Sequence, residues 1–273
     1  MNKPELITRS ITGLLIGIIS LAAIVCSPWT YLLWICLITL LGTREYLKLE
    51  FNPGSFSIRV IFPVILMLSV AATGYTIFED ISPVPVLIAL PVVIGLGFLL
   101  QLPSRKEIAG LVNTNNALFS ATGYIGLPML SGCIFLTGEY EWSFVLVPVL
   151  LIWANDIGAY MIGSQWGKHK IAPAISPGKS IEGTVGGGLI TLISGIIMSM
   201  LWPDMPLLYI GVLSFCTPFF ALAGDLWEST LKRHAGVKDS GKLLPGHGGI
   251  LDRYDSLLFV LPVAALAYFI FVL

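Results

Sequence analysis

The chain has 273 residues, of which 56% are hydrophobic and only 11% are charged, and its mean hydropathy is +0.88. An average globular protein carries roughly 25% charged residues, so this composition could not cover a soluble core with polar surface. Lysine and arginine (15) nearly balance aspartate and glutamate (16), which excludes the polybasic field of a nucleic-acid-binding protein. We therefore expect an integral membrane protein that binds no nucleic acid.

A membrane-spanning helix needs about 20 mostly apolar residues. Nine such stretches predict an all-α, polytopic membrane protein, divided into an N-terminal region of about five spans, 1–140, and a C-terminal region, 141–273, with two polar loops at 165–183 and 232–254. In chain order the stretches are 10–27, 29–43, 60–78, 83–101, 117–137, 142–164, 184–202, 206–231 and 255–273. The four cysteines lie in apolar runs without metal-type spacing and are expected to be buried free thiols.

Lysine and arginine fall in every second gap between the predicted spans. The gaps after the first, third, fifth and seventh spans contain none, and the charged residues there are acidic: Glu79, Asp80, Glu139, Glu141 and Asp204. The positive-inside rule makes the basic side cytoplasmic. With nine spans, the N-terminus lies in the cytoplasm, the C-terminus lies outside, and both polar loops face the cytoplasm.

Two of the predicted spans contain carboxylates. A charged side chain inside an apolar helix is costly unless it is paired or hydrated, so Asp156 indicates either a functional site or an ion pair with a lysine of the next loop. Asp225 begins a polar stripe, because offsets of three, four and seven residues place Glu228, Ser229 and Lys232 on the same helical face. The stripe indicates a hydrated cavity, or alternatively an interfacial helix end with ion pairs between neighbouring turns.

The loop after the sixth span contains Lys179 and Glu182 among glycines. The Gly-Lys-Ser run around Lys179 has the ending of a P-loop, but that pattern requires a glycine where this chain has Pro173, and no strand is predicted before it. Two compatible interpretations remain. One is a polar site that the backbone can approach closely, and the other is helix packing through Gly183 and Gly187.

Glycines surround His247 in the last loop, among them Gly248 and Gly249, and free the backbone to present N–H groups to an anion. Asp252 and Asp255 follow at the start of the last span, where N-capping and the helix dipole offer a structural alternative. Carboxylates that can hold Mg²⁺, cations for phosphate oxygens and an adjoining hydrocarbon phase together suggest a polyphosphate substrate and a lipid partner.

Residues 229–255 form what we call the signature segment. They read Ser-Thr-Leu-Lys-Arg-His-Ala-Gly-Val-Lys-Asp-Ser-Gly-Lys-Leu-Leu-Pro-Gly-His-Gly-Gly-Ile-Leu-Asp-Arg-Tyr-Asp. This segment resembles the signature of phosphatidate cytidylyltransferases (CDP-diacylglycerol synthases). The stretches that begin at Asp156, Gly167 and Ser176 also resemble the family, with a small departure at Gly178, where its motif has a lysine or similar polar residue. The specific resemblance covers roughly 150–273, which makes 141–273 the catalytic region.

The resemblance implies the reaction CTP + phosphatidate → CDP-diacylglycerol + pyrophosphate, with Mg²⁺ as cofactor and a second, monovalent cation left open. It also implies a homodimer in the plasma (inner) membrane, with its active site facing the cytoplasm. Asp225 and Asp252 would be the metal-binding carboxylates. Lys232, Arg233, Lys238, Asp239, His247 and Arg253 are assigned to catalysis. Asp156, Lys179, Glu182, Ser229, Gly248, Gly249 and Asp255 are assigned to substrate binding.

Three alternatives stay open from the sequence. A CTP-dependent lipid or polyprenol kinase shares the Ser-Pro-x-Lys-x-x-Glu-Gly type of segment, but the complete Lys-Asp, His-Gly-Gly and Asp-Arg-x-Asp elements argue against it. An ion-coupled transporter would use Asp156 and Asp225 at mid-membrane, yet the charges cluster in loops on one side. A CDP-archaeol synthase would differ mainly in its lipid tails.

Overall fold

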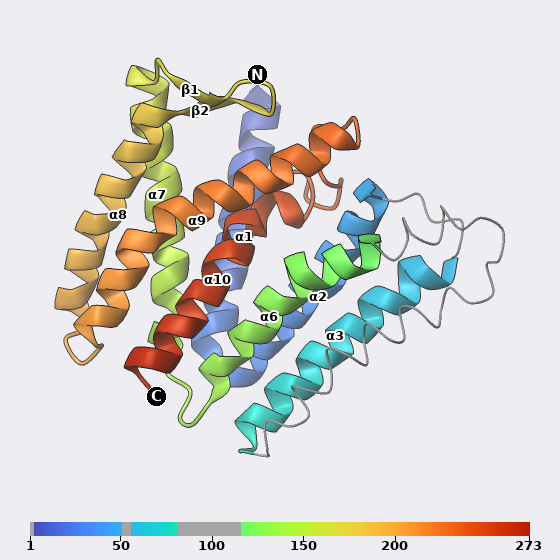
Figure 1. The fold of residues 1–273 in the computed structure, drawn as a ribbon, viewed down its shortest axis with the longest axis vertical. Helices are drawn as coiled ribbons and strands as arrows, with labels where there is room; N and C mark the ends of the chain where they lie inside the picture. The colour runs from blue at the N-terminus through green and yellow to red at the C-terminus, as the bar shows by residue number, and fades with distance from the viewer. Residues whose placement is uncertain (1–2, 51–55, 81–115) are drawn as a thin grey trace. The chain divides into compact units, whose positions relative to one another are not determined.

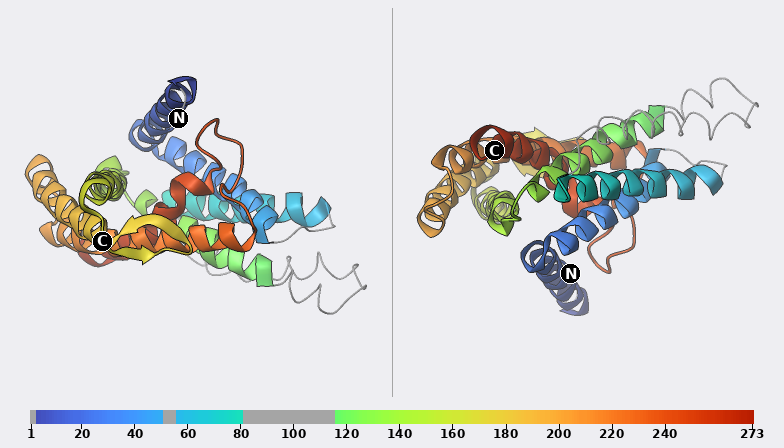
Figure 2. Two further views of the ribbon diagram at one scale, coloured as in Figure 1. Left: turned by 90° about the horizontal axis from the view of Figure 1, so that it is seen from above. Right: turned by 90° about the horizontal axis from the view of Figure 1, so that it is seen from below.

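A computed structural model of the chain describes residues 3–50, 56–80 and 116–273. These residues are mainly helical and fall into two compact units, and Figures 1 and 2 show the elements of each. The first unit comprises 1–140 with 234–254, and the second comprises 141–233 with 255–273. The structure therefore groups most of the signature segment's loop with the N-terminal helices. The predicted span 83–101 lies outside the described residues.

The first unit begins with three helices, α1 (Lys3–Cys26), α2 (Pro28–Glu50) and α3 (Phe56–Phe78). Ser27 separates α1 from α2 because its Oγ accepts a hydrogen bond from Thr30 N (3.1 Å) and Pro28 occupies the first helical position, which is a typical helix start. A further helical stretch, 116–136, contains the π-helical turn η1 (Thr122–Gly126), α6 (Leu127–Gly132) and the 3₁₀ turn η2 (Cys133–Leu136). Tyr31 of α2 donates to Gly132 O (2.9 Å), which joins these helices in the buried core.

The second unit contains α7 (Trp142–Trp166), α8 (Ile181–Leu201), α9 (Leu207–His234) and most of α10 (Leu251–Phe271). Helices α7 and α8 approach closely at glycines. A Cβ at Gly183 would lie 2.9 Å from Ala159 O, and one at Gly187 would lie 2.8 Å from Asn155 O. The packing interpretation of these two glycines is therefore confirmed, since only a residue without a side chain allows this backbone separation.

A two-stranded antiparallel hairpin joins α7 to α8, and the sequence analysis predicted no strands in this loop. The hairpin consists of β1 (Lys170–Ala172) and β2 (Ser176–Ser180). Strands of three and five residues carry no hydrophobic alternation, so periodicity could not reveal them. Ser180 ends β2 and caps α8, since its Oγ accepts a hydrogen bond from Gly183 N (3.2 Å). Seen from above, the hairpin lies over α9 (Figure 2).

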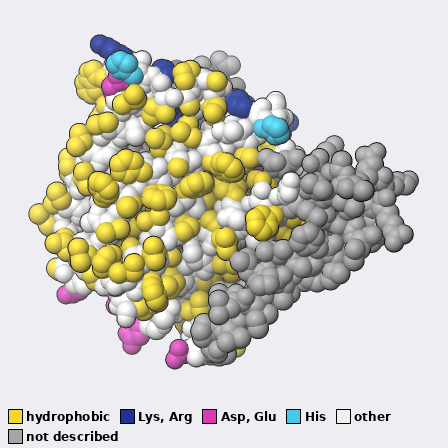
Figure 3. All heavy atoms as spheres, viewed as in Figure 1, with side chains coloured by type: hydrophobic (Ala, Val, Ile, Leu, Met, Phe, Trp, Pro, Cys, Tyr) yellow, Lys and Arg dark blue, Asp and Glu magenta, His cyan; other side chains and the backbone are white. Residues whose placement is uncertain are grey.

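Eight of the nine predicted apolar stretches lie in helices that the structure describes. Among the described residues, six helices are long and apolar enough to cross a membrane, at Val60–Phe78, Asn116–Leu136, Trp142–Trp166, Ile181–Leu201, Leu207–His234 and Leu251–Phe271. Hydrophobic side chains are spread across the described part of the face drawn in Figure 3. The chain is therefore a helical, polytopic integral membrane protein.

All four cysteines are free, but the prediction that they are buried is wrong for two of them. Cys36 and Cys133 are buried, whereas Cys26 is exposed and Cys216 is only partly covered. The physical reason is that an apolar side chain of a membrane helix can face lipid as favourably as it can face the protein core, so hydrophobic surroundings in the sequence do not imply burial.

Candidate active site

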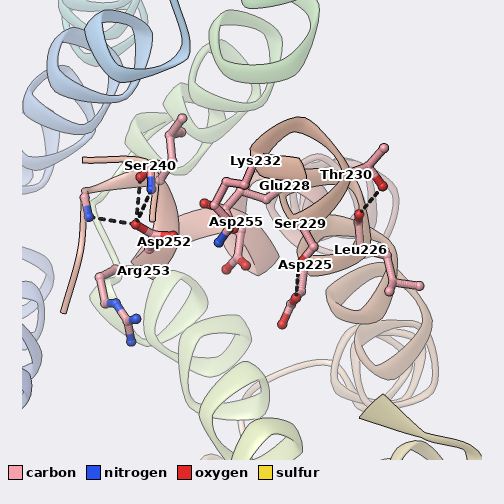
Figure 4. Close-up of polar contacts among 12 residues, drawn as sticks. Asp225, Leu226, Glu228, Ser229, Thr230, Lys232, Ser240, Asp252, Arg253 and Asp255 are labelled. Atoms are coloured by element: carbon pink, nitrogen blue, oxygen red, sulfur yellow. Dashed lines mark hydrogen bonds and ion pairs between the residues drawn. The ribbon is translucent and has the colours of Figure 1, made fainter. Parts of the chain in front are cut away.

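The second unit brings Lys179 and Asp225 together. Lys179 lies on β2 and its Nζ is 2.7 Å from Asp225 Oδ2. The other carboxylate oxygen, Oδ1, accepts a hydrogen bond from Ser229 Oγ at 3.2 Å, which Figure 4 shows. The Asp225 side chain is 35% exposed, so it stays accessible to a further ligand. The hairpin thus positions a cation beside the stripe that spacing predicted on α9.

Two more predicted carboxylates belong to the same unit as Asp225. Gly224 packs against the backbone of Asp255, because a Cβ at Gly224 would clash with Asp255 O, and this contact brings α10 against α9. Asp255 interacts electrostatically with Asp225, Asp156 and Lys179. Asp156 is exposed on α7 and accepts a hydrogen bond from the Asn155 side chain at 3.3 Å. Asp255 of α10 is therefore near enough to Asp156, Asp225 and Lys179 to feel their charges.

The C-terminal end of α9 is held by polar contacts as well. Lys232 forms an ion pair with Glu228, one turn earlier, and the Glu228 side chain is almost completely buried. Arg233 Nε donates to Ile175 O (3.2 Å), which ties the end of α9 to the turn of the hairpin. These contacts place the first two basic residues of the signature segment beside the hairpin that carries Lys179.

Glu182, at the first turn of α8, holds the segment between α7 and the hairpin. Its carboxylate accepts hydrogen bonds from the backbone N–H groups of Lys168 and His169, and Oε1 lies 2.5 Å from His169 Nδ1. A carboxylate at a helix N-terminus is also favoured by the helix dipole. The structure therefore shows Glu182 fixing the start of the hairpin, and through it the position of Lys179.

In the first unit, the Asp252 side chain forms hydrogen bonds with the loop of the signature segment. Its Oδ2 accepts hydrogen bonds from Ser240 N (2.8 Å), Ser240 Oγ (2.9 Å) and Gly249 N (2.7 Å), as Figure 4 shows in part. Asp252 is the second residue of α10, and its donors Ser240 and Gly249 precede the helix. The side chain therefore fixes the loop to the start of α10 and does not act as the N-cap of the helix. Asp255 lies one turn further along α10, and its Oδ1 accepts from Ser256 N (2.7 Å).

Two of the glycines around His247, Gly248 and Gly249, are in close contact with the Asp252 carboxylate. Gly248 adopts a φ of +83°, which disfavours any residue with a side chain, and a Cβ there would clash with the Asp252 carboxylate. Gly249 was predicted to present its N–H group to a substrate anion, but in the structure this group donates to Asp252. One N–H group of the predicted nest therefore binds a carboxylate of the protein itself, because Asp252 follows Gly249 within one helical turn.

The remaining predicted residues of the signature segment have more exposed positions. Arg253 is exposed, and its Nε donates to His247 O at 3.1 Å. Lys238 and Asp239 are exposed in the loop. His247 is half-buried and lies against α1, where a Cβ at Gly13 would lie 3.1 Å from its Nε2.

The sequence analysis missed one residue of this region, Glu45 on α2. Its side chain is buried, and its Oε2 accepts hydrogen bonds from Ser240 Oγ (3.1 Å) and Leu251 N (3.0 Å). The rule that flagged Asp156, a carboxylate next to an apolar run, could have identified Glu45 too. Its neighbour Arg44 made the position resemble an ordinary charged helix end.

Carboxylate oxygens are ligands that a hard divalent cation such as Mg²⁺ prefers. Within the described parts of the chain, no three His, Cys, Asp or Glu side chains form a cluster that could hold a metal ion by themselves. Mg²⁺ usually takes one or two protein carboxylates and completes its shell with water and substrate phosphates. Asp225 already contacts a cation, Lys179, at 2.7 Å, which shows that its surroundings stabilise positive charge.

The chain is similar to a known family and to several known proteins. A model of the cytidylyltransferase family matches residues 7–271. A phosphatidate cytidylyltransferase of Staphylococcus haemolyticus is 34% identical over 263 residues, covering 93% of this chain and 96% of that protein. One of Bacillus subtilis is 34% identical over 269 residues, covering 93% and 94%, and one of Staphylococcus saprophyticus is 44% identical over 142 residues, covering 51% and 54%. The chain therefore belongs to the cytidylyltransferase family.

Proposed function

We propose that this protein is a nucleotidyltransferase that converts CTP and phosphatidate into CDP-diacylglycerol and pyrophosphate in phospholipid biosynthesis. The complete signature segment carries this proposal, together with relatives named phosphatidate cytidylyltransferase that match over almost their whole length. An integral membrane protein is suited to the reaction, because one substrate and one product are lipids and the other two are water-soluble.

The chemistry follows from charge. An oxygen of the phosphatidate phosphate attacks the α-phosphorus of CTP, the bond from that phosphorus to the bridging oxygen breaks, and pyrophosphate leaves with the electron pair. A phosphate monoester has a second pKa near 6, so the nucleophile is already largely ionised at about pH 7 and a general base is not required. The protein must instead hold two polyanions together against their repulsion. On this view His247 donates a hydrogen bond and abstracts no proton.

The metal-binding carboxylates we propose are Asp225 and Asp252. Bound Mg²⁺ would neutralise charge on the phosphate oxygens and on the leaving pyrophosphate. Both residues belong to the signature segment or precede it by one turn, and the accessible Asp225 carboxylate is paired with a lysine that phosphate oxygens could also attract. Asp255 and Asp156 would bind the substrates or their counter-ions from the same side of the second unit.

The phosphate contacts we propose come from basic residues whose positions are fixed by neighbours. Lys179 is held on β2, Lys232 by Glu228, and Arg233 by the hairpin turn, so each could receive a phosphate oxygen with little rearrangement. Lys238 and Arg253 are exposed on the loop and would contact the nucleotide. Ser229 would orient the Asp225 carboxylate through its hydrogen bond.

We also propose that the site faces the cytoplasm. The second unit supports this by itself. Its hairpin and the end of α9 lie at one end, joined by the Arg233 contact, and this end carries Lys168, Lys170, Lys179 and Lys232. Trp142 and Trp202 meet at the opposite end, with ring centroids 6.3 Å apart, where the charged residues are Glu141 and Asp204. Basic residues concentrate on the cytoplasmic side of membrane proteins.

This orientation predicts the accessibility of engineered cysteines. In a background with Cys26 and Cys216 replaced by serine, a membrane-impermeant maleimide applied to intact cells should label Asp204→Cys. It should label Lys242→Cys only after the membrane is permeabilised, because that position belongs to the basic side. Lys242 is exposed, unlike the neighbouring Ser240, so a lack of labelling cannot reflect burial. Labelling of both cysteines in intact cells would contradict the orientation.

The reaction itself can be tested with isotopically labelled CTP and purified protein in mixed micelles with Mg²⁺. With phosphatidate as acceptor, label from the α-phosphorus should enter the organic phase as a liponucleotide. Label from the γ-phosphorus should remain in the aqueous phase as pyrophosphate. Diacylglycerol should not replace phosphatidate, because its hydroxyl is not ionised and would need a catalytic base.

The same experiment separates the alternatives. Organic-phase label from the γ-phosphorus with an alcohol acceptor would establish a lipid kinase and contradict the proposed reaction. No transfer of either label, with protein that remains folded and monodisperse, would favour the transporter alternative.

A further inference from the structure

Glu45 is a buried carboxylate of α2 that the family signature does not include. Its side chain and backbone are together only 6% exposed, although a charged carboxylate is rarely buried without partners. It lies 195 residues before Ser240 in sequence, yet the two side chains share a hydrogen bond of 3.1 Å. A buried carboxylate with a partner so distant in sequence holds two separate segments of the chain together.

One oxygen of Glu45 connects both ends of the loop 240–251. Oε2 accepts from Ser240 Oγ, where the loop begins, and from Leu251 N, where α10 begins. The surrounding backbone is in close contact with this carboxylate. A Cβ at Gly241 would lie 2.6 Å from Glu45 Oε1, and a Cβ at Gly249 would clash with Oε2. The loop therefore closes around the Glu45 carboxylate.

Ser240 links Glu45 to Asp252. The Ser240 hydroxyl lies 3.1 Å from Glu45 Oε2 and 2.9 Å from Asp252 Oδ2, and the backbone N–H groups of Gly249 and Leu251 donate to Asp252 and Glu45 respectively. The carboxylates of Asp252 and Glu45 thus hold Gly249 and Leu251, two nearby residues of one turn. Any displacement of the Glu45 carboxylate would be passed to the Asp252 side chain through this shared hydroxyl.

The first two helices contact the signature segment at further points. Tyr254 OH lies 2.9 Å from Ser20 Oγ of α1 and accepts a hydrogen bond from Trp34 Nε1 of α2 at 3.4 Å. His247 packs against Gly13 of α1. These contacts belong to the same unit as Glu45, and they show that α1 and α2 form the support on which the loop rests.

We propose that Glu45 is a positioning residue for the reaction: it acts through Ser240 and Leu251 to hold the loop 240–251, and with it the carboxylate of Asp252, in the active arrangement. This proposal rests on the proposed role of Asp252 in the site. Residues that orient the groups of a metal or catalytic site typically contribute about 10- to 100-fold to affinity or activity. Glu45 itself contacts no substrate or reacting atom in this proposal.

The proposal predicts that hydrogen bonding, and not charge, is what Glu45 supplies. Glu45→Gln keeps a carbonyl oxygen that can accept from both Ser240 Oγ and Leu251 N. Glu45→Ala removes this acceptor and leaves the Leu251 N–H group unpaired, while the Ser240 hydroxyl can still donate to Asp252 Oδ2. We therefore expect Glu45→Ala to lower kcat/KM by about 10- to 100-fold, and Glu45→Gln to retain most of the activity. Glu79→Ala, an exposed carboxylate after α3, is the matched control and should be unchanged.

Amide hydrogen exchange supplies a readout that does not depend on the reaction. In Glu45→Ala the amide of Leu251 should exchange about tenfold faster or more, because it loses its acceptor. In Glu45→Gln and Glu79→Ala its exchange should match that of the unmodified protein. The double variant Glu45→Ala with Ser240→Ala should also lose less kcat/KM than the two single losses combined, because both substitutions remove the same hydrogen bond. Ser240→Ala, a milder change, keeps this comparison available if Glu45→Ala does not fold.

The outcomes distinguish the proposal from the site on which it rests. Equal losses of activity in Glu45→Gln and Glu45→Ala would show that the charge is needed, and would overturn the positioning role. Unchanged exchange at Leu251 in Glu45→Ala would overturn the structural contact itself. Faster exchange with full activity would also overturn the positioning role, and would in addition mean that the loop's arrangement does not matter to the reaction, which counts against the proposed site.

Discussion

Asp225→Asn should lower kcat/KM by about 10²- to 10³-fold, corresponding to roughly 2.7–4 kcal/mol of transition-state stabilisation, the range observed when a preorganised electrostatic group is removed from an active site. Asparagine keeps the shape of the side chain and an oxygen that can accept from Ser229 Oγ. It removes the negative charge that pairs with Lys179 and that we propose binds Mg²⁺. The loss should therefore lie in the chemistry and in cation binding, with the fold preserved.

The measurement pairs activity with cation binding. Titration with Mn²⁺ in place of Mg²⁺, followed by electron paramagnetic resonance, should show weaker binding by Asp225→Asn without any turnover. Thr230→Ala is the matched control, because Thr230 is exposed on the same helix and its Oγ1 donates only locally, to Leu226 O at 2.7 Å (Figure 4). A variant Asp225→Asn with near-full activity would remove Asp225 from the metal site. Lost activity with unchanged Mn²⁺ binding would assign Asp225 to the substrates.

Asp252 should show a separation between its structural and its chemical role. Asp252→Asn keeps an oxygen that can accept from Ser240 and Gly249, so the loop should remain in place while kcat/KM falls by about 10²- to 10³-fold through loss of charge. Asp252→Ala should lose activity to the same extent and should also destabilise the protein. Each buried donor left without an acceptor costs roughly 1–3 kcal/mol.

Thermal unfolding and the exchange of the Gly249 amide measure the structural part, and the labelled-CTP assay measures the chemical part. The control is Asp80→Asn, an exposed carboxylate at a φ of +53°, where asparagine is well tolerated. If Asp252→Asn remained fully active, Asp252 would be a loop-fixing residue only, and Asp225 would have to bind the metal without it. In that outcome Asp252 would resemble Glu45, for which the amide is also expected to suffice.

Much of the fold could be predicted because membrane helices are determined locally. A helix that crosses a bilayer must satisfy its backbone hydrogen bonds within its own segment, so about 20 apolar residues are enough to indicate it. The polar stripe on α9 was predictable for the same reason. Asp225 and Ser229 are four residues apart, and the structure shows the hydrogen bond that this spacing allows. The packing of Gly183 and Gly187 likewise follows from a repeat of four.

The site's assembly could be predicted only in part, because its contacts join residues that are distant in sequence. The residue composition indicated a cation-binding, phosphate-binding chemistry, and the signature segment indicated the family. Neither indicated that Lys179 reaches Asp225, because that ion pair depends on a short hairpin without any hydrophobic alternation. The prediction that Gly249 binds a substrate anion took no account of Asp252, which supplies a carboxylate to the same N–H group.

The sequence by itself determined the class of this protein, the eight helices that the structure describes in the predicted places, and the segment that we propose carries its chemistry, since each rests on local spacing. Only the tertiary structure decided what supports that segment. Glu45 meets Ser240 across 195 residues and Leu251 across 206, and the loop 234–254 joins the N-terminal helices because of such contacts. Hydrophobic burial brings these elements together without regard to their separation along the chain, so no local pattern could encode the partner of a single buried carboxylate.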